Sequence, residues 1–340
     1  MRGMQLTEDR AGFPMSGRGV AAAHAMPKES TMTVRSSVAV VTGTDARAAQ
    51  DAAVLARRAL GADAPKAALI LTSGAASVAT GWEAAREVLD RVPFVGGSVP
   101  GILSDDGLVA SGAAVVCFAG GAISPSFAGG GRAAGLVEAA DRAGRLILAG
   151  ASHRRHFPRG IALAFARSNA GGAPGEFLAR WREIAGPKLR TVLNAVPGEF
   201  LYSSGSEVPG ILGVLCLEGP FQSGLGVTQG TQDAPRGEST DPATLAHGAA
   251  DAALTAIKKL EGQPARAVLI VESLDRLVRL GAAGRDEWTA MRETIGRNVP
   301  CLGWLTTAVS AAGRGVVAPG PASVIVAAIG DAPPPPPQGA

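Results

Sequence analysis

A repeated pattern of strands and glycine-rich bends limits what this 340-residue chain can fold into. Residues 92–120 read VPFVGGSVPGILSDDGLVASGAAVVCFAG, and residues 299–330 follow the same course, from Val-Pro through a polar bend to a β-branched run that ends in glycine. The elements before the two copies also correspond, with helical patterns at 45–60 and 242–260 and strand-like runs at 67–71 and 267–271. The pattern predicts that an αβ unit has been duplicated.

Tryptophan positions support the repeat, because three of the four tryptophans occupy the same slot in it. Each lies in a helical pattern whose apolar residues recur at spacings of three and four. A weaker third copy, which begins with the strand-like run 161–166, carries the middle tryptophan. The three apolar sets are Trp82, Ala85 and Leu89; Phe177, Trp181 and Ile184; and Trp288, Met291 and Ile295.

The alternation of strands and helices, with a hairpin signal at Asp106-Gly107, predicts an α/β fold. We expect internally duplicated, layered lobes with mixed β-sheets flanked by helices. Residues 169–175 (NAGGAPG) are the best candidate for a linker between two lobes. The predicted organisation is a disordered extension over 1–31, a first lobe over 32–168, a second lobe over 169–330 and a Pro-rich disordered tail over 331–340.

Composition narrows the class of partner. A net charge of +3, with 46% hydrophobic and 18% charged residues, is typical of a globular protein. The basic cluster 153–156 (HRRH) is too short to predict nucleic-acid binding. No apolar run reaches membrane-spanning length, so we expect no membrane association. Cys117, Cys216 and Cys301 lie in apolar runs and are odd in number, which favours a reducing compartment and a cytoplasmic location.

A serine in a glycine turn is the obvious catalytic candidate, but its signature is incomplete. Ser98 lies in GGSVPG, whereas a nucleophile elbow needs glycine two residues after the serine, where Pro100 stands. The four histidines form no visible catalytic set, and the sequence contains no phosphate-loop motif or metal-ligand spacing. We therefore predict no enzymatic activity, no metal and no cofactor. A hydrolase that uses Ser98 or Ser273 is the least favoured alternative.

Strands that end in polar, glycine-rich turns present backbone N–H groups and small hydroxyls around a space that can hold a small ligand. The two better-matched copies each contain such a place. The predicted ligand-binding residues are Ser73, Gly96, Gly97, Ser98 and Gly101 in the first copy, and Arg276, Gly303, Trp304, Thr306 and Thr307 in the second. The alternative is that these glycines only form tight turns and that Trp304 only fills the core.

The order of these motifs resembles the FIST family, a two-part sensory domain (FIST N and FIST C) of bacterial signalling proteins. The family's N-terminal half carries a G-C-S-x-x-G turn, which is similar to residues 96–101, with Gly97 at the cysteine position. Its C-terminal half carries Cys-x-Gly-Arg, of which Arg276 remains, and a Gly-Glu pair where this chain has 307–308. The Pro-x-x-Gly-aromatic motif of the same half is similar to Pro300, Gly303 and Trp304.

The resemblance covers residues 36–330 and implies a non-catalytic sensory module. Such a module would bind a small ligand, such as an amino acid or a related metabolite, and would signal through a partner protein. The alternative hypothesis is a protein-interaction scaffold that has lost ligand binding, with the polyproline segment 333–337 as a docking peptide.

Overall fold

The computed structural model describes residues 33–76, 81–130, 133–150, 160–197, 201–203, 210–228, 241–313, 316–317 and 323–333. The predictions for the extension 1–31, for most of the tail 331–340 and for the basic cluster 153–156 concern residues outside this set. Residues 32–340 form one compact unit. Among the described residues, we find no helix whose length and apolar content would let it span a bilayer.

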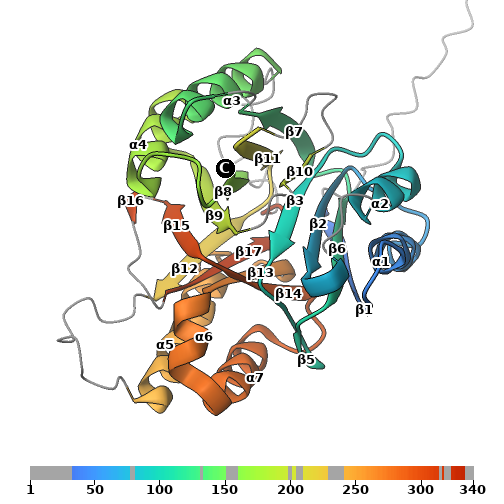
Figure 1. Cartoon of the computed structure of the whole chain (residues 1–340), viewed down its shortest axis with the longest axis vertical. Helices are drawn as coiled ribbons and strands as arrows, with labels where there is room; N and C mark the ends of the chain where they lie inside the picture. Colours follow the sequence, from blue (N-terminus) through green and yellow to red (C-terminus); the bar gives the residue numbers. More distant parts are fainter. Residues whose placement is uncertain are drawn as a thin grey trace, which may run out of the picture. The chain divides into compact units, whose positions relative to one another are not determined.

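The described strands form three mixed sheets, each flanked by helices, which confirms the predicted fold class (Figure 1). The first sheet contains β1 (Arg35–Thr42), β6 (Gly112–Ala119), β2 (Ala67–Ser73), β3 (Phe94–Val99) and β10 (Leu201–Ser203) in that order. The middle sheet contains β16 (Val316–Val317), β15 (Ala308–Ala312), β9 (Leu189–Val196), β8 (Gly160–Arg167), β11 (Leu212–Glu218) and β7 (Ser124–Gly129). The last sheet contains β12 (Ser223–Thr228), β17 (Val324–Gly330), β13 (Ala265–Ser273), β14 (Cys301–Thr306), β4 (Ile102–Ser104) and β5 (Gly107–Val109).

One topology recurs in all three sheets. In each, the first of four strands pairs antiparallel with the fourth, the fourth pairs antiparallel with the second, and the second pairs parallel with the third. The middle unit follows this order as fully as the other two, although its sequence match is weaker. The topology therefore repeats three times, whereas the duplication of the sequence itself stays a prediction.

Short strands connect the three units in a cycle. After the third strand of each unit, the chain adds a strand to the next sheet: β4 pairs with β14, β15 pairs with β9, and β10 pairs with β3. The segment 169–175, which was expected to link two lobes, joins β8 to α4 inside the middle unit. The strands β8 and β9 pair in parallel on either side of it.

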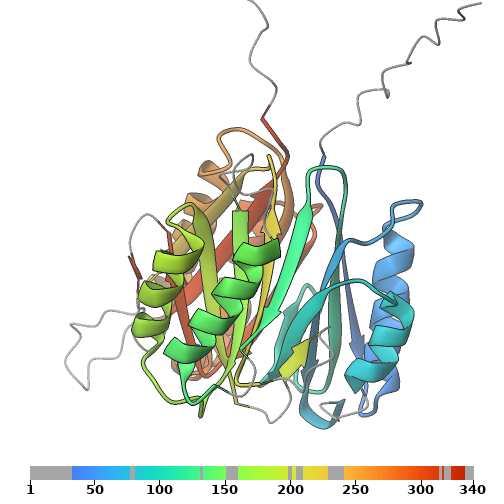
Figure 2. The ribbon, with the colours of Figure 1, turned by 90° about the horizontal axis from the view of Figure 1, so that it is seen from above.

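Helices cover the outer face of each sheet (Figures 1 and 2). In β2, Leu69 and Leu71 face a central core that all three sheets share, whereas Ala68 and Ile70 face the helices. This alternation is the expected consequence of the two-residue period of a strand. Helices α1 (Arg47–Ala59) and α2 (Gly81–Leu89) cover the first sheet, α3 (Leu136–Gly150) and α4 (Pro174–Ala185) the middle sheet, and α5 (Pro242–Lys258), α6 (Leu274–Leu280) and α7 (Gly284–Ile295) the last sheet.

The apolar sets around the three tryptophans lie on the second helix of the first and middle units and on α7 of the last. Trp181 and Met291 are fully buried against their sheets, and Trp82 packs near Phe94 with ring centroids 6.3 Å apart. The predicted helix start at Asp241-Pro242 is also present, because the Asp241 carboxylate accepts a hydrogen bond from the Thr244 amide.

Close packing of α5 on β12 gives a direct test of this arrangement. A Cβ added at Gly226 would lie 1.7 Å from the Ala252 carbonyl oxygen, which belongs to the helix backbone. Because backbone cannot yield as a side chain can, we expect Gly226→Ala to lower the free energy of unfolding by about 2 kcal/mol, measured by chemical denaturation. Gly313→Ala is the matched control, since a Cβ there meets nothing within 4 Å. Equal stability of the two variants would contradict the packing of α5 on β12.

Candidate functional site

A cavity of about 490 Å³ lies in the middle unit, where β8 and β9 end. The carboxyl ends of parallel strands in α/β sheets are a common place for ligands. The wall is completed by the loop from β8 to α4, by the start of α3 and by β15, the strand that the last unit adds to the middle sheet. Its polar lining residues are Arg167, Ser168, Asn169, Thr307 and Ser310, and its apolar ones include Leu136, Ala166, Leu193, Ala195 and Ala308.

Short side chains on neighbouring strands leave this space open. Ala166, Ala195 and Ala308 stand directly opposite one another on β8, β9 and β15, and we call this set the alanine rung. Two residues along, Ser310 lies opposite Leu193, and Ser310 is only 4% exposed. Because Ser310 lines the cavity, its hydroxyl can donate a hydrogen bond to a ligand there or accept one from it.

The charge in the cavity wall is positive. Pro174, the first residue of α4, lines the cavity, and no side chain caps that helix, so the positive end of the helix dipole lies there. Glu176, in the first turn of the same helix, is exposed and does not line the cavity. Arg167, the last residue of β8, is the one charged residue among the described lining residues. Its Nε is buried and has no hydrogen-bond partner in the described part of the chain. The lining therefore suits an anion.

The Thr307 hydroxyl can turn toward a ligand at little cost. It donates to the Ala195 carbonyl oxygen at 2.9 Å, and the same oxygen also accepts from the Thr307 amide at 3.2 Å and from the Thr306 hydroxyl. Because a carbonyl oxygen has two lone pairs, the loss of one of three donors leaves it satisfied. Of the ten predicted site residues, Thr307 is the one that lines this cavity.

The predicted residues of the first copy lie together around the ends of β2 and β3. Ser73 is buried and its hydroxyl donates to the Val109 carbonyl oxygen, so it stabilises the following hairpin. Gly96 and Gly97 are buried strand residues, and Ser98 is partly exposed and lies opposite Thr72. The Gly101 carbonyl accepts from the Leu305 amide at 2.9 Å, which attaches this turn to the last sheet.

The predicted residues of the second copy are mostly buried in the core. Trp304 is fully buried in the central core and stacks on Phe165 with ring centroids 6.0 Å apart. Gly303 lies against the ring of Trp288, where a Cβ would approach within 2.6 Å. Thr306 is buried, and its hydroxyl donates to backbone carbonyls.

Arg276 is fully buried in an ion pair. Its Nε and Nη2 donate to the two carboxylate oxygens of Glu287 at 2.9 and 2.7 Å, and Nη2 also donates to the Leu245 carbonyl oxygen. Glu272 completes the cluster, is 3% exposed, and has an Oε1 atom without a partner among the described residues. Burial, and secondly the Glu287 charge, raise the pKa of the Glu272 carboxyl to about 8 against the opposing effect of Arg276.

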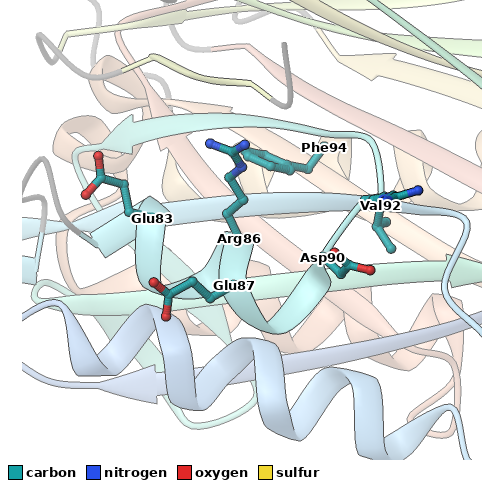
Figure 3. Close-up of a pocket in the computed structure, with 7 residues that line it drawn as sticks. Glu83, Arg86, Glu87, Asp90, Val92 and Phe94 are labelled. Carbon is teal, nitrogen blue, oxygen red and sulfur yellow. The ribbon is translucent and has the colours of Figure 1, made fainter. Parts of the chain in front are cut away.

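A second, more charged groove of about 740 Å³ lies beside α2 and the start of β3 (Figure 3). Figure 3 shows the Arg86 side chain directed toward Phe94, with Glu83 and Glu87 on the same helix. Arg86, Glu83 and Glu87 are all exposed. Acidic and basic groups alternate along this groove and it has little apolar wall, so it offers less to a small ligand than the cavity does.

Comparison with known proteins gives no family for this chain. No family model matches the sequence, and no curated protein matches it. The chain is similar in structure to cyanuric acid hydrolase from A. caulinodans (12% identity, TM-score 0.43, covering 86% of this chain and 99% of that one). It is also similar to a chorismatase (9%, 0.45, 88% and 99%) and to T. maritima PurL in complex with ATP (11%, 0.28, 88% and 72%). Similarity at this level assigns no function, and the resemblance to the FIST family stays a prediction.

Sequence reasoning missed Arg167, Ser168, Asn169 and Ser310. A usable signal was present, because a strand that ends in arginine and leads through a glycine-rich loop into a helix is a typical anion-binding arrangement. The same glycines were interpreted as a linker, and Ser310 carries no local signal at all. Among the described residues, no group of His, Cys, Asp and Glu could hold a metal ion.

The Glu272 carboxyl should make stability depend on pH. Its pKa is about 8 in the folded protein, against an ordinary value of 4.5 for a glutamate, so folding takes up a proton between these values and stability falls as pH rises through this window. We expect Glu272→Gln to match the parent at pH 5 and to be more stable at pH 8 by a few kcal/mol, at roughly 1 kcal/mol per pH unit, in denaturation experiments.

Glu87→Gln, at an exposed position, is the control for a general charge effect and should show no such difference. If Glu272→Gln instead destabilises the protein equally at both pH values, the Glu272 carboxylate is ionised and paired with Arg276.

Proposed function

We propose that this protein is a sensory module that binds a small anionic metabolite in the cavity of the middle unit and signals through a partner protein. The observation that carries the proposal is the position of the cavity, at the ends of β8 and β9, beside Arg167 and the uncapped start of α4. Its volume of about 490 Å³ is in the usual range for small-molecule sites.

The lining supports binding more than chemistry. Ser168, Thr307 and Ser310 supply hydroxyls, but the described lining residues include no His, Asp, Glu, Lys or Cys that could act as a base beside them. Ser98 and Ser273, the serines of the hydrolase hypothesis, do not line the cavity, and the Ser273 hydroxyl caps α6 by accepting from the Arg276 amide. A small carboxylate, of the kind that amino acids and related metabolites carry, matches this set of donors.

A cytoplasmic location is part of the same proposal. Cys117, Cys216 and Cys301 form no disulfide. Burial raises the pKa of Cys117 and of Cys301 to about 12, which keeps these two thiols protonated. Cysteines that form no disulfide suit a reducing compartment.

The proposal predicts a ligand-dependent rise in melting temperature that two cavity variants remove. In a thermal-shift screen of small carboxylates, amino acids and inorganic phosphate, a ligand at 100 times its Kd stabilises by about 2.7 kcal/mol, which raises Tm by a few degrees. Arg167→Gln removes the charge, and Ser310→Leu fills the space, so we expect the shift to disappear in both.

Arg86→Gln is the matched control, because Arg86 is an exposed arginine in the separate groove of Figure 3. It should keep the full shift. Ser310→Leu should retain the melting temperature of the ligand-free parent, since the new side chain enters a cavity rather than a packed core. A panel without any hit, or a hit that both cavity variants retain, would contradict the proposal and favour the scaffold hypothesis.

A further inference from the structure

We infer that the ligand of this cavity is a short-chain 2-oxo or 2-hydroxy acid, a carboxylate without an ammonium group. The inference rests on the proposed function and narrows its ligand class. Three features of the cavity wall support it: the positive charge of Arg167, the lack of Asp and Glu among the described lining residues, and the apolar side chains.

The wall provides for one negative charge. The start of α4 and Arg167 lie at the same cavity, and the Ser310 and Thr307 hydroxyls can each donate to an oxygen. A 2-oxo or 2-hydroxy acid carries its carboxylate beside a second oxygen, so it offers acceptors to several of these donors at once.

The wall contains no partner for an ammonium group. None of the described lining residues is Asp or Glu. The first turns of the two helices at the cavity contain Glu138 in α3 and Glu176 in α4, and neither residue lines the cavity. Glu176 is exposed, and both carboxylate oxygens of Glu138 are engaged, one by the Ala134 amide at 2.8 Å and the other by Arg142. An ammonium group inside the cavity would stand near Arg167 without a carboxylate, so a zwitterionic amino acid is disfavoured by repulsion and by desolvation.

The apolar wall suits a short aliphatic chain. Leu193 on β9 and Leu136 at the start of α3 both line the cavity, and so do the residues of the alanine rung on β8, β9 and β15. Leu193 is 2% exposed and Leu136 is 5% exposed, so an aliphatic group placed against them is removed from water. Inorganic phosphate would meet the donors but would gain nothing from this wall.

The test compares matched acids that differ only at the second carbon. The probes are 3-methyl-2-oxobutanoate, 2-hydroxy-3-methylbutanoate and L-valine, titrated calorimetrically into the full-length protein, with inorganic phosphate as a head-group probe. We expect the oxo or hydroxy acid to bind at least about tenfold more tightly than L-valine, because the unpaired ammonium group of L-valine costs this much. We expect a similar advantage over phosphate, because phosphate has no aliphatic group to bury. L-valine that binds as tightly as the other two acids would overturn the inference.

A charge placed at the rim tests the missing partner directly. Thr307 is exposed at the edge of the cavity, so Thr307→Asp introduces a carboxylate without disturbing the core. We expect this variant to lower the preference for the oxo acid over L-valine by about tenfold. Thr307→Asn, which is isosteric with the Asp variant, has no charge and retains a hydrogen-bond donor, should keep the parent's preference. Equal changes in both variants would overturn the inference.

Failure of the inference and failure of the proposed function give different results. If L-valine or phosphate binds best and Arg167→Gln abolishes this binding, the cavity is an anion site and only the ligand class is wrong. If none of the four probes binds, or if binding is unaffected by Arg167→Gln and Ser310→Leu, both are wrong.

Discussion

The rest of this structure depends on one central apolar core, which is formed by the inward faces of all three sheets. Strands such as β2 and β11 are buried on both faces, because one face meets this core and the other meets helices. Continuous apolar strands of this kind gain stability from every residue, but they tolerate few polar groups away from their ends. The chemistry of the molecule is therefore concentrated where the strands end.

Because the three units share one topology, the position occupied by the alanine rung occurs three times. Thr72 lies opposite Ser98 in the first sheet, Ala166 opposite Ala195 in the middle sheet, and Glu272 opposite Leu305 in the last. In the last unit, the Arg276–Glu287 ion pair lies beside Glu272 and is fully buried. The backbone topology is the same in both units. The middle unit has an open cavity because its side chains at this position are small, whereas Glu272 and Leu305 fill the position in the last unit.

The sequence predicted the fold better than the site, for a physical reason. Periodicity reports which residues face a core, so the helix faces around Trp181 and Trp288 could be predicted correctly. The hairpin predicted from Asp106-Gly107 is also present, with its turn one residue earlier, at 105–106. The residues that contact a buried side chain are often distant in sequence. Nothing in the sequence around Arg276 indicates that Glu287 neutralises its charge. Likewise, the cavity needs Ser310 opposite Leu193, a strand pairing over more than a hundred residues.

If the proposed ligand binds, β15 connects its site to the last unit. β15 leaves the last unit and pairs with β9 of the middle unit, and Thr306 and Thr307 bind the Ala195 carbonyl at this junction. A ligand held by Arg167 and Thr307 would touch two units at once, so its binding energy would favour whichever arrangement of these units closes the cavity best. Differential affinity of this kind is what the proposed sensory function requires.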